Sequence, residues 1–204
     1  MAFTFFFRDL DAIKLIPEYV LSDISKKSDV KIWDAGCANG AEIYSILMHL
    51  KETLDEEQFK KIRILASDID SSNRFKKIIE DGTYKKNQIS SVPSNILKKY
   101  FELDTKSLDT YVISEKLRKK ISYQKHDLLS LNAIGFGFDL IICKHVLQHF
   151  NIKDQMAVLN MFYNALSDEG FLLCEYSQEI PEDINYRFLK VLPEKKLYQK
   201  TLLK

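Results

Sequence analysis

A glycine-containing segment follows a short apolar run near the start of the chain, where residues 32–45 read IWDAGCANGAEIYS. Gly36 and Gly40 carry no Cβ, so the backbone can approach a ligand closely at these positions. A helical pattern begins near Ala41, and its first N–H groups would point toward the same place. The acid Asp34 precedes the glycines. This combination predicts a ligand-binding loop between a strand and a helix.

A second acid stands at the end of the next predicted strand. Asp68 lies 28 positions after Gly40, which leaves room for one helix, a loop and a strand. Ligands of open parallel sheets bind beyond the carboxyl ends of the strands, so residues 34–40, 67–70 and 143–145 should converge. A carboxylate at position 68 is then placed to accept hydrogen bonds from both hydroxyls of a ribose.

The loop allows more than one interpretation. The two glycines can serve only tight packing between strand and helix, and a dinucleotide site is a second alternative. A dinucleotide loop favours G-x-G-x-x-G, whereas this chain reads G-x-x-x-G with Cys37 at the place of the second glycine. A ligand with an adenosine and a compact charged amino-acid tail, without phosphate, fits this loop better. The sequence therefore predicts S-adenosylmethionine as the cofactor.

Strands and helices alternate along the chain and must position these residues. Apolar residues at helical spacing predict helices in residues 11–25, 41–54, 71–82, 93–101 and 152–170. Short apolar runs predict strands in residues 30–36, 61–70, 138–143 and 171–177, and one or two more in residues 187–203. Residues 110–130 are predicted to form a β-hairpin that leads into a third main strand. This alternation predicts right-handed crossovers and a mostly parallel sheet.

Residue types also predict where some helices begin and end. The serines at the start of residues 71–82 and Gly82 at its end bound one helix. A Ser or Asn cap is expected to open the helix in residues 93–101, and Gly170 is expected to stop the helix that begins at Ile152.

Composition excludes several classes of protein. The 204 residues carry a net charge of +1, with 46% hydrophobic and 29% charged residues, so neither a nucleic-acid partner nor a membrane surface is indicated. No apolar run reaches the roughly 20 residues of a membrane span. The start MAFTFFF lacks a basic region and a cleavage site, so it is not a signal peptide. An odd count of cysteines in apolar surroundings (Cys37, Cys143, Cys174) predicts reduced thiols and a cytoplasmic location.

Several segments, taken in order, carry a resemblance to a known family. These segments are TFFFRD, IWDAGCANGAEIYSI, ILASDID, FDLIICKHVLQHF and FLLCEYSQEI. The chain resembles the catalytic domain of the chemotaxis-receptor methyltransferases, the CheR family of protein-glutamate O-methyltransferases. The resemblance implies a class I methyltransferase fold (Rossmann-like, α/β, doubly wound) with an antiparallel C-terminal strand. We therefore expect one domain over residues 1–204, with a small β-hairpin insertion at about 84–122.

The same resemblance implies a role for individual residues. Glu42 would hold the methionine amino group, Asp68 the ribose, and Asp127 and Leu128 would flank the adenine. His145 would lie near the methionine part. The other residues expected to bind the cofactor are Thr4, Asp34, Gly36, Cys37, Gly40, Ile69 and Lys144.

The acceptor is implied by the family to be a protein carboxylate, such as one in a chemoreceptor. Thr4 and Arg8 would contact either the methionine end of the cofactor or this carboxylate, which Arg8 would orient through a two-pronged contact. His149 stands where the family has a tyrosine beside the transferring methyl group. A glutamate is already ionised near neutral pH, so no base is needed. An amine acceptor would need one, and the imidazole of His149 has a suitable pKa in its unperturbed state.

The chain departs from the family pattern at several positions, which leaves two alternative functions open. Ala41 and Ile43 replace an acid and a proline, Lys144-His145 replaces an Arg-Asn pair, and the family's amino-terminal helical domain has no counterpart in residues 1–204. The alternatives are a non-catalytic cofactor-binding relative in a motility pathway and a methyltransferase for a lysine or a small molecule.

Simpler structural roles also stand beside the chemical ones. Arg8 can be an ordinary surface arginine, His149 a partnered structural histidine, and Phe5 to Phe7 packing residues. His145 and His149 are four residues apart, but neither a third ligand nor an H-E-x-x-H motif accompanies them, so no metal site is expected. Trp33 is expected in the core, His126 is expected to have no chemical role, and the cysteines are expected to be buried.

Overall fold

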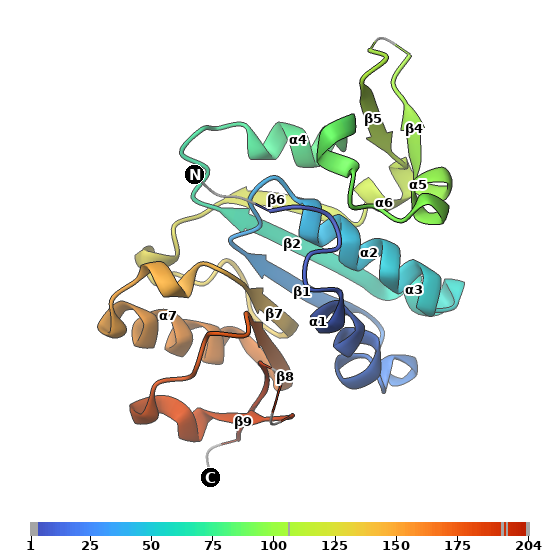
Figure 1. Cartoon of the computed structure of the whole chain (residues 1–204). Helices are drawn as coiled ribbons and strands as arrows, with labels where there is room; N and C mark the ends of the chain where they lie inside the picture. Colours follow the sequence, from blue (N-terminus) through green and yellow to red (C-terminus); the bar gives the residue numbers. More distant parts are fainter. Residues whose placement is uncertain (1–3, 106, 193, 195, 203–204) are drawn as a thin grey trace.

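The computed structural model describes residues 4–105, 107–192, 194 and 196–202. Its centre is a seven-stranded sheet with the order β6-β2-β1-β7-β8-β10-β9 (Figure 1). The first five strands run parallel, and β10 pairs antiparallel with both β8 and β9. The strands are β1 (Val30–Ala35), β2 (Ile62–Asp68), β6 (Ile121–Lys125), β7 (Phe138–Cys143), β8 (Leu166–Cys174), β9 (Phe188–Lys190) and β10 (Leu197–Lys200).

This arrangement confirms the predicted fold class, a mostly parallel, doubly wound sheet with an antiparallel strand near the carboxyl end. The apolar start and the last predicted segment include residues 1–3, 193, 195 and 203–204, which lie outside the described residues, as does residue 106. That residues 1–204 form one domain stays a prediction.

Helices cover both faces of the sheet, because side chains of a strand alternate between its faces. Ile32 and Ile142 pack in the core cluster that holds α1 and α2, whereas Trp33 and Ile141 pack in the cluster that holds α7. Trp33 is fully buried, which confirms its predicted place in the core. The helices are α1 (Leu10–Leu15), α2 (Ala41–Thr53), α3 (Glu56–Lys61), α4 (Phe75–Asp81), α5 (Ser94–Tyr100), α6 (Glu115–Arg118) and α7 (Ile152–Ala165).

A second, three-stranded antiparallel sheet lies beside the main one, with the order β3 (Thr83–Lys85), β5 (Thr110–Ile113), β4 (Phe101–Leu103). The hairpin predicted within residues 110–130 is wrong. Residues after β5 form the short helix α6, whose Leu117 is buried, and the chain then enters β6. Because β6 pairs in parallel with β2 over five residues, it belongs to the main sheet.

Helix ends differ from the prediction in their caps. The Asp70 carboxylate, rather than a serine, accepts hydrogen bonds from the first N–H groups of α4, and Pro93 opens α5 without a side-chain cap. Gly82 ends α4 in the left-handed region, as predicted. Gly170 does not stop α7, which ends at Ala165. It lies inside β8, where a Cβ would come within 2.7 Å of the carbonyl oxygen of Phe138.

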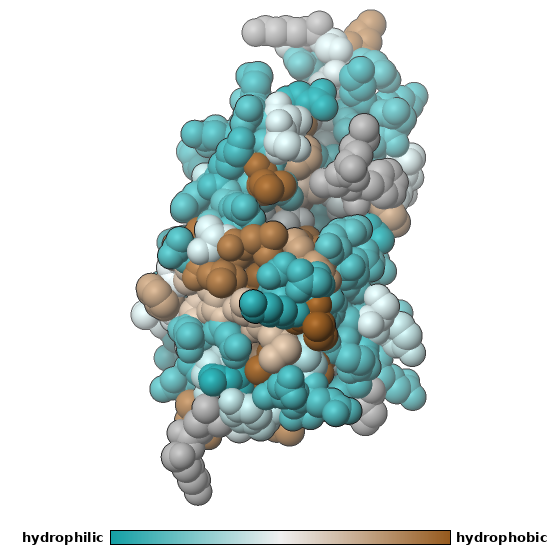
Figure 2. All heavy atoms as spheres, turned by 90° about the vertical axis from the view of Figure 1, so that its left-hand side faces the viewer, coloured by the Kyte–Doolittle hydropathy of each residue, from teal (hydrophilic) through white to brown (hydrophobic). Residues whose placement is uncertain are grey.

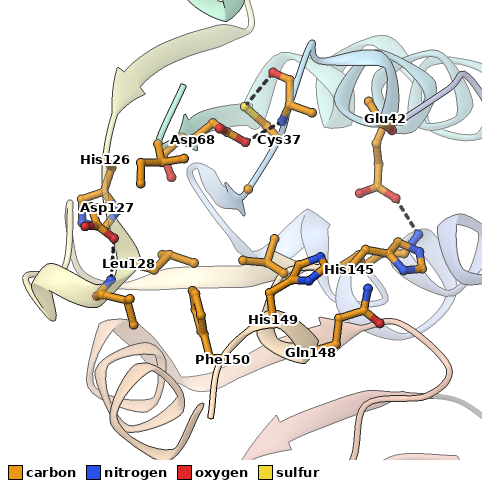
Figure 3. Close-up of a pocket in the computed structure, with 18 of the residues that line it drawn as sticks. Cys37, Glu42, Asp68, His126, Asp127, Leu128, His145, Gln148, His149 and Phe150 are labelled. Carbon is orange, nitrogen blue, oxygen red and sulfur yellow. Dashed lines mark hydrogen bonds and ion pairs between the residues drawn. The ribbon is translucent and has the colours of Figure 1, made fainter. Parts of the chain in front are cut away.

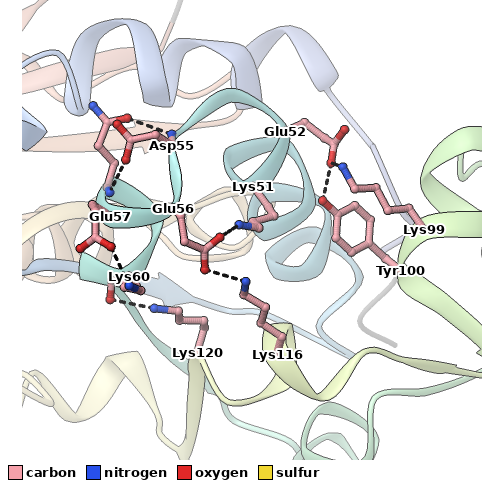
Figure 4. Close-up of polar contacts among 11 residues, drawn as sticks. Lys51, Glu52, Asp55, Glu56, Glu57, Lys60, Lys99, Tyr100, Lys116 and Lys120 are labelled. Atoms are coloured by element: carbon pink, nitrogen blue, oxygen red, sulfur yellow. Dashed lines mark hydrogen bonds and ion pairs between the residues drawn. The ribbon is translucent and has the colours of Figure 1, made fainter.

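Ion pairs tie the second sheet and its helices to α2 and α3 (Figure 4). The Glu56 carboxylate pairs with Lys51 on α2 and with Lys116 on α6. Hydrogen bonds from these two ammonium groups lower the pKa of Glu56 to about 2. Glu52 accepts hydrogen bonds from Lys99 and Tyr100 on α5. These contacts join segments that lie far apart in the sequence.

Within the part of the chain that the structure describes, no helix combines the length and the apolar character of a membrane span.

Gly40 offers a test of how the loop before α2 is packed. It has a φ of +84°, and a Cβ there would lie 2.7 Å from Cγ1 of Ile79. Gly137 also has a positive φ, of +73°, but open space around it. We expect Gly137→Ala to cost about 1–2 kcal/mol from backbone strain, and Gly40→Ala to cost clearly more, because Ile79 must also move. Urea unfolding of both variants measures the difference, and equal costs would contradict the packing argument.

Candidate functional site

A cavity of about 640 Å³ opens at the carboxyl ends of β1, β2 and β7. Figure 3 shows Asp127 and Leu128 at one end of it and Glu42 and His145 at the other, with Asp68 on the wall between them. Twelve of the fourteen predicted site residues line the cavity: Thr4, Arg8, Gly36, Cys37, Glu42, Asp68, Ile69, Asp127, Leu128, Lys144, His145 and His149. The expected convergence of three strand ends is confirmed.

The Asp68 carboxylate holds two neighbouring loops together. Its Oδ2 accepts a hydrogen bond from the Ala38 amide at 2.9 Å, and its Oδ1 accepts one from the Asp70 amide at 2.8 Å. The carbonyl oxygen of Ser67 accepts further bonds from the amides of Gly36 and Cys37. Each carboxylate oxygen has two lone pairs, so Asp68 can accept from a ligand as well.

Gly36 allows this loop to approach the segment after β7. It has a φ of +100°, and a Cβ at this position would lie 2.3 Å from Cγ2 of Val146. Any side chain would therefore push the two strand ends apart. Gly36 lines the cavity, whereas Gly40 lies outside its lining and packs against Ile79 and Tyr84. Gly40 therefore fits the interpretation that the glycines permit tight packing. Gly36 fits this interpretation and also the one in which the backbone lies close to a ligand.

Asp34 also lies outside the lining of the cavity, although it was predicted as a cofactor-binding residue. Its side chain is buried beneath the loop, and its Oδ2 has no hydrogen-bond partner among the described residues. Burial, with the nearby charges of Glu42 and Asp68, raises the pKa of Asp34 well above its ordinary value, against the opposing effect of Lys144. The neutral acid is therefore the favoured form.

Lys144 is a buried cation at the end of the cavity where Glu42 and His145 lie. Its Nζ donates to Glu42 at 2.5 Å and lies 2.9 Å from the Asp9 carboxylate, while its side chain is 2% exposed. Burial lowers the pKa of Lys144, but the two carboxylates outweigh burial and raise it overall. Lys144 therefore stays charged and fixes the orientation of Glu42.

The histidines around the cavity do not form a metal site. His145 has a φ of +59°, and its amide donates to Glu175 at 2.9 Å. His149 ends the 3-10 helix Leu147–His149, so the two histidines do not share a regular helix. In the described ranges, no group of three His, Cys, Asp or Glu side chains could hold a metal ion. His126, expected to have no role, lines the cavity and packs its ring against Trp33.

Further lining residues were missed from the sequence. Several of them directly follow the Lys144-His145 pair or the Asp127-Leu128 pair, so extending each predicted strand end by a few positions would have found them. The cation of Arg8 lies 5.7 Å from the centre of the Phe5 ring, and Phe6 is fully buried. The missed residues are His126, Leu129, Val146, Gln148 and Phe150, while Ala38 and Ser67 lie within the ranges expected to converge but were given no role.

Comparison with known proteins decides the family. Residues 2–195 match the family model described as CheR methyltransferase, SAM binding domain. The chain belongs to this family. It is 29% identical over 201 residues to a chemotaxis protein methyltransferase of Borreliella burgdorferi, covering 95% of this chain and 70% of the relative. It is 27% identical to chemotaxis protein methyltransferase 2 of Vibrio cholerae, of which it covers 62%.

A solved structure supports the same fold. An rRNA methyltransferase from Streptomyces viridochromogenes superposes with a TM-score of 0.58 at 12% identity, covering 98% of this chain and 86% of that structure. At this identity the likeness shows the fold alone. The family model confirms S-adenosylmethionine as the cofactor of this methyltransferase domain.

The residues around the cavity fit this cofactor. Carboxylates occur at both ends and on the wall, at Asp127, Glu42 and Asp68, and the apolar Leu128 lies beside Asp127. A ligand with hydroxyl and ammonium donors needs such acceptors, and an adenine ring needs apolar contact. The fit therefore rests on the donor set of this chain as well as on the family.

Asp34 generates a prediction about stability and pH. At a pH below its ordinary pKa of 3.8, Asp34 is protonated in both the folded and the unfolded chain. As the pH rises, the unfolded chain loses the proton first, so the contribution of Asp34 to stability falls. Asp34→Asn removes this titration and keeps a neutral side chain. The free energy of unfolding of the variant, relative to the native chain, should therefore rise as the pH increases above the ordinary pKa of 3.8. A flat difference would show that Asp34 is ionised in the fold.

Proposed function

We propose that this protein transfers a methyl group from S-adenosylmethionine to the side-chain carboxylate of a glutamate in a chemoreceptor or a related protein. The carrying observation is that Arg8 lines the same cavity as Asp68 and Glu42. A guanidinium presents two parallel donors, which match a carboxylate. The names of the relatives agree with an acceptor from chemotaxis.

The residues along the cavity support one orientation of the cofactor. Asp127 and Leu128 would flank the adenine, Asp68 would accept hydrogen bonds from the ribose, and Glu42 would accept one from the methionine amino group. These residues occur in this order along the cavity. When bound, the cofactor supplies a methyl group on a sulfonium. Lys144 donates a hydrogen bond to Glu42 and so orients it toward the cavity.

Positioning is the main contribution that the protein makes to such a reaction. Aligning the acceptor with the methyl group can supply roughly 7–11 kcal/mol of the barrier. A glutamate acceptor is ionised near neutral pH and needs no base. In this proposal Arg8 holds the acceptor carboxylate, and His149 lines the same cavity.

A second candidate is methyl transfer to an amine, such as a lysine or a small molecule. The observation that favours it is an imidazole, His149, in the wall of the cofactor cavity, since a protonated amine must lose a proton before it can attack. A non-catalytic, cofactor-binding role in a motility pathway is the third. The stability of the methylated product in base separates the first two, because esters hydrolyse readily and methylamines do not.

The face around the cavity suits a protein acceptor in the cytoplasm. Figure 2 shows apolar side chains gathered on the side of the molecule toward which β1 and β2 point. Ile69 and Leu129, which line the cavity, are 57% and 45% exposed. Exposed apolar residues of this kind support contact with another protein. The three cysteines are all unpaired and buried, which agrees with a reducing compartment.

Substitution of Asp68 tests the cofactor site. Asp68→Asn replaces one of the two carboxylate oxygens with an N–H donor, which faces one of the two backbone amides that donate to Asp68. The link between the two loops and the contact with the ribose should therefore both weaken. We expect the affinity for the demethylated cofactor to fall by about tenfold or more, as measured by calorimetry. Asp81→Asn, which removes an exposed ion pair with Lys77, is the matched control and should leave affinity unchanged. No binding to the native chain would refute the proposed function.

Substitution of Arg8 tests the acceptor. With a chemoreceptor cytoplasmic domain and labelled cofactor, we expect base-labile methyl incorporation. Arg8→Lys keeps the positive charge but loses the two parallel N–H donors of the guanidinium. The value of kcat/KM should therefore fall by about tenfold or more, while the affinity for the cofactor changes little. Base-stable incorporation would instead support the amine acceptor, and cofactor binding without any transfer would support the non-catalytic role.

A further inference from the structure

A second cavity, of about 410 Å³, lies next to the first. Lys144 and His145 line both cavities and form their common wall. The rest of the second cavity comes from the start of α1, the carboxyl end of β8 and the segment before β10. It therefore lies beside the cofactor site but is built largely from other residues.

The lining of this second cavity is acidic. Its carboxylates are Asp9, Asp11, Glu175 and Glu194, against two ammonium groups, Lys144 and Lys196. Lys144 pairs with Asp9 of this lining and with Glu42 outside it, and Lys196 pairs with Glu179 outside it, so four lining carboxylates face two ammonium groups that outside carboxylates also neutralise. The cavity thus keeps an excess of negative charge, which would attract a cation.

Glu175 gives the second, independent observation. Its side chain is 2% exposed, and its Oε2 accepts a hydrogen bond from the amide of His145 at 2.9 Å. Its Oε1 is buried and has no hydrogen-bond partner among the described residues. A buried carboxylate oxygen without a donor is costly, and a ligand that donates to it would remove this cost.

The kind of cation follows from the surrounding side chains. Three or more metal ligands do not come together anywhere in the described part of the chain, so a bare metal ion is a poor match. At the rim, the Lys196 ammonium lies 5.9 Å from the centre of the exposed Tyr176 ring, so this ring already attracts one cation and can contact another ammonium or guanidinium group. An organic cation with N–H donors satisfies both Glu175 and Tyr176.

We propose that the second cavity is a binding site for an alkylammonium or guanidinium group that donates a hydrogen bond to Oε1 of Glu175. Because this cavity shares a wall with the cofactor site, a basic side chain near the acceptor residue could enter it. That role in acceptor choice rests on the proposed function. The binding of the cation itself does not.

Chemical-shift titration of the amides of Tyr176 and Ser177 tests this site directly. The probes are n-butylammonium, the amide-blocked amino acid Nα-acetyl-lysine-N-methylamide, and the matching norleucine derivative, which lacks the charge. We expect saturable shifts with both cations and none with the norleucine derivative. Stronger binding of the lysine derivative assigns the site to a protein side chain, and stronger binding of butylammonium assigns it to a free amine.

Two variants make the test specific. Glu175→Gln keeps an oxygen that can accept from the His145 amide, and it should weaken binding of both cations by about tenfold or more. Glu169→Gln, an exposed position in β8, the strand that directly precedes Glu175, should leave it unchanged. Absence of saturable shifts in the native chain, or equal shifts with the norleucine derivative, would overturn the proposal. Calorimetry with the demethylated cofactor reports separately on the proposed function, so failure of one does not imply failure of the other.

Discussion

The candidate site depends on one carboxylate that joins two loops. Each Asp68 oxygen accepts a backbone amide, one from the loop after β1 and one from the loop after β2. Parallel strands bring their carboxyl ends to one edge of the sheet, but pairing alone does not fix the loops that follow. By tying both loops to its own side chain, Asp68 sets the width of the cavity and is itself held in place. A ribose would thus meet an acceptor whose orientation is already fixed, which lowers the entropic cost of binding.

A second cluster of charge organises the other end of the cavity. The buried ammonium of Lys144 pairs with both Glu42 and Asp9, while burial raises the pKa of Asp34 beneath the loop. Burying several carboxylates around one ammonium favours the neutral form of one of them, and the raised pKa of Asp34 is the result. The resulting environment is negative enough to suit a sulfonium and an ammonium group.

Much of the site could be predicted from the sequence, because it depends on local order. The glycine loop, Asp68 and the Lys144-His145 pair each follow a strand directly, and strand ends converge in this fold. The sequence did not reveal that Gly40 faces Ile79, that Asp34 points beneath the loop, or that β6 pairs with β2. Those outcomes depend on contacts between segments far apart in the chain. The place of Gly170 in β8 depends on such a contact as well, because the carbonyl oxygen of Phe138 approaches it too closely for a side chain.

Lys144 and His145 form the wall between the two cavities, and carboxylates hold both residues in place. His145 adopts a left-handed backbone conformation that is rare for residues with a side chain, and the buried Glu175 holds its amide there. The neighbouring Lys144 is held from the opposite direction by Glu42 and Asp9. Two adjacent residues are thus fixed by carboxylates that come from α2, from the segment before α1 and from the end of β8. Glu42 lines the first cavity, whereas Asp9 and Glu175 line the second. A ligand that changes the hydrogen bonding of a carboxylate in one cavity would therefore act on the wall of the other cavity.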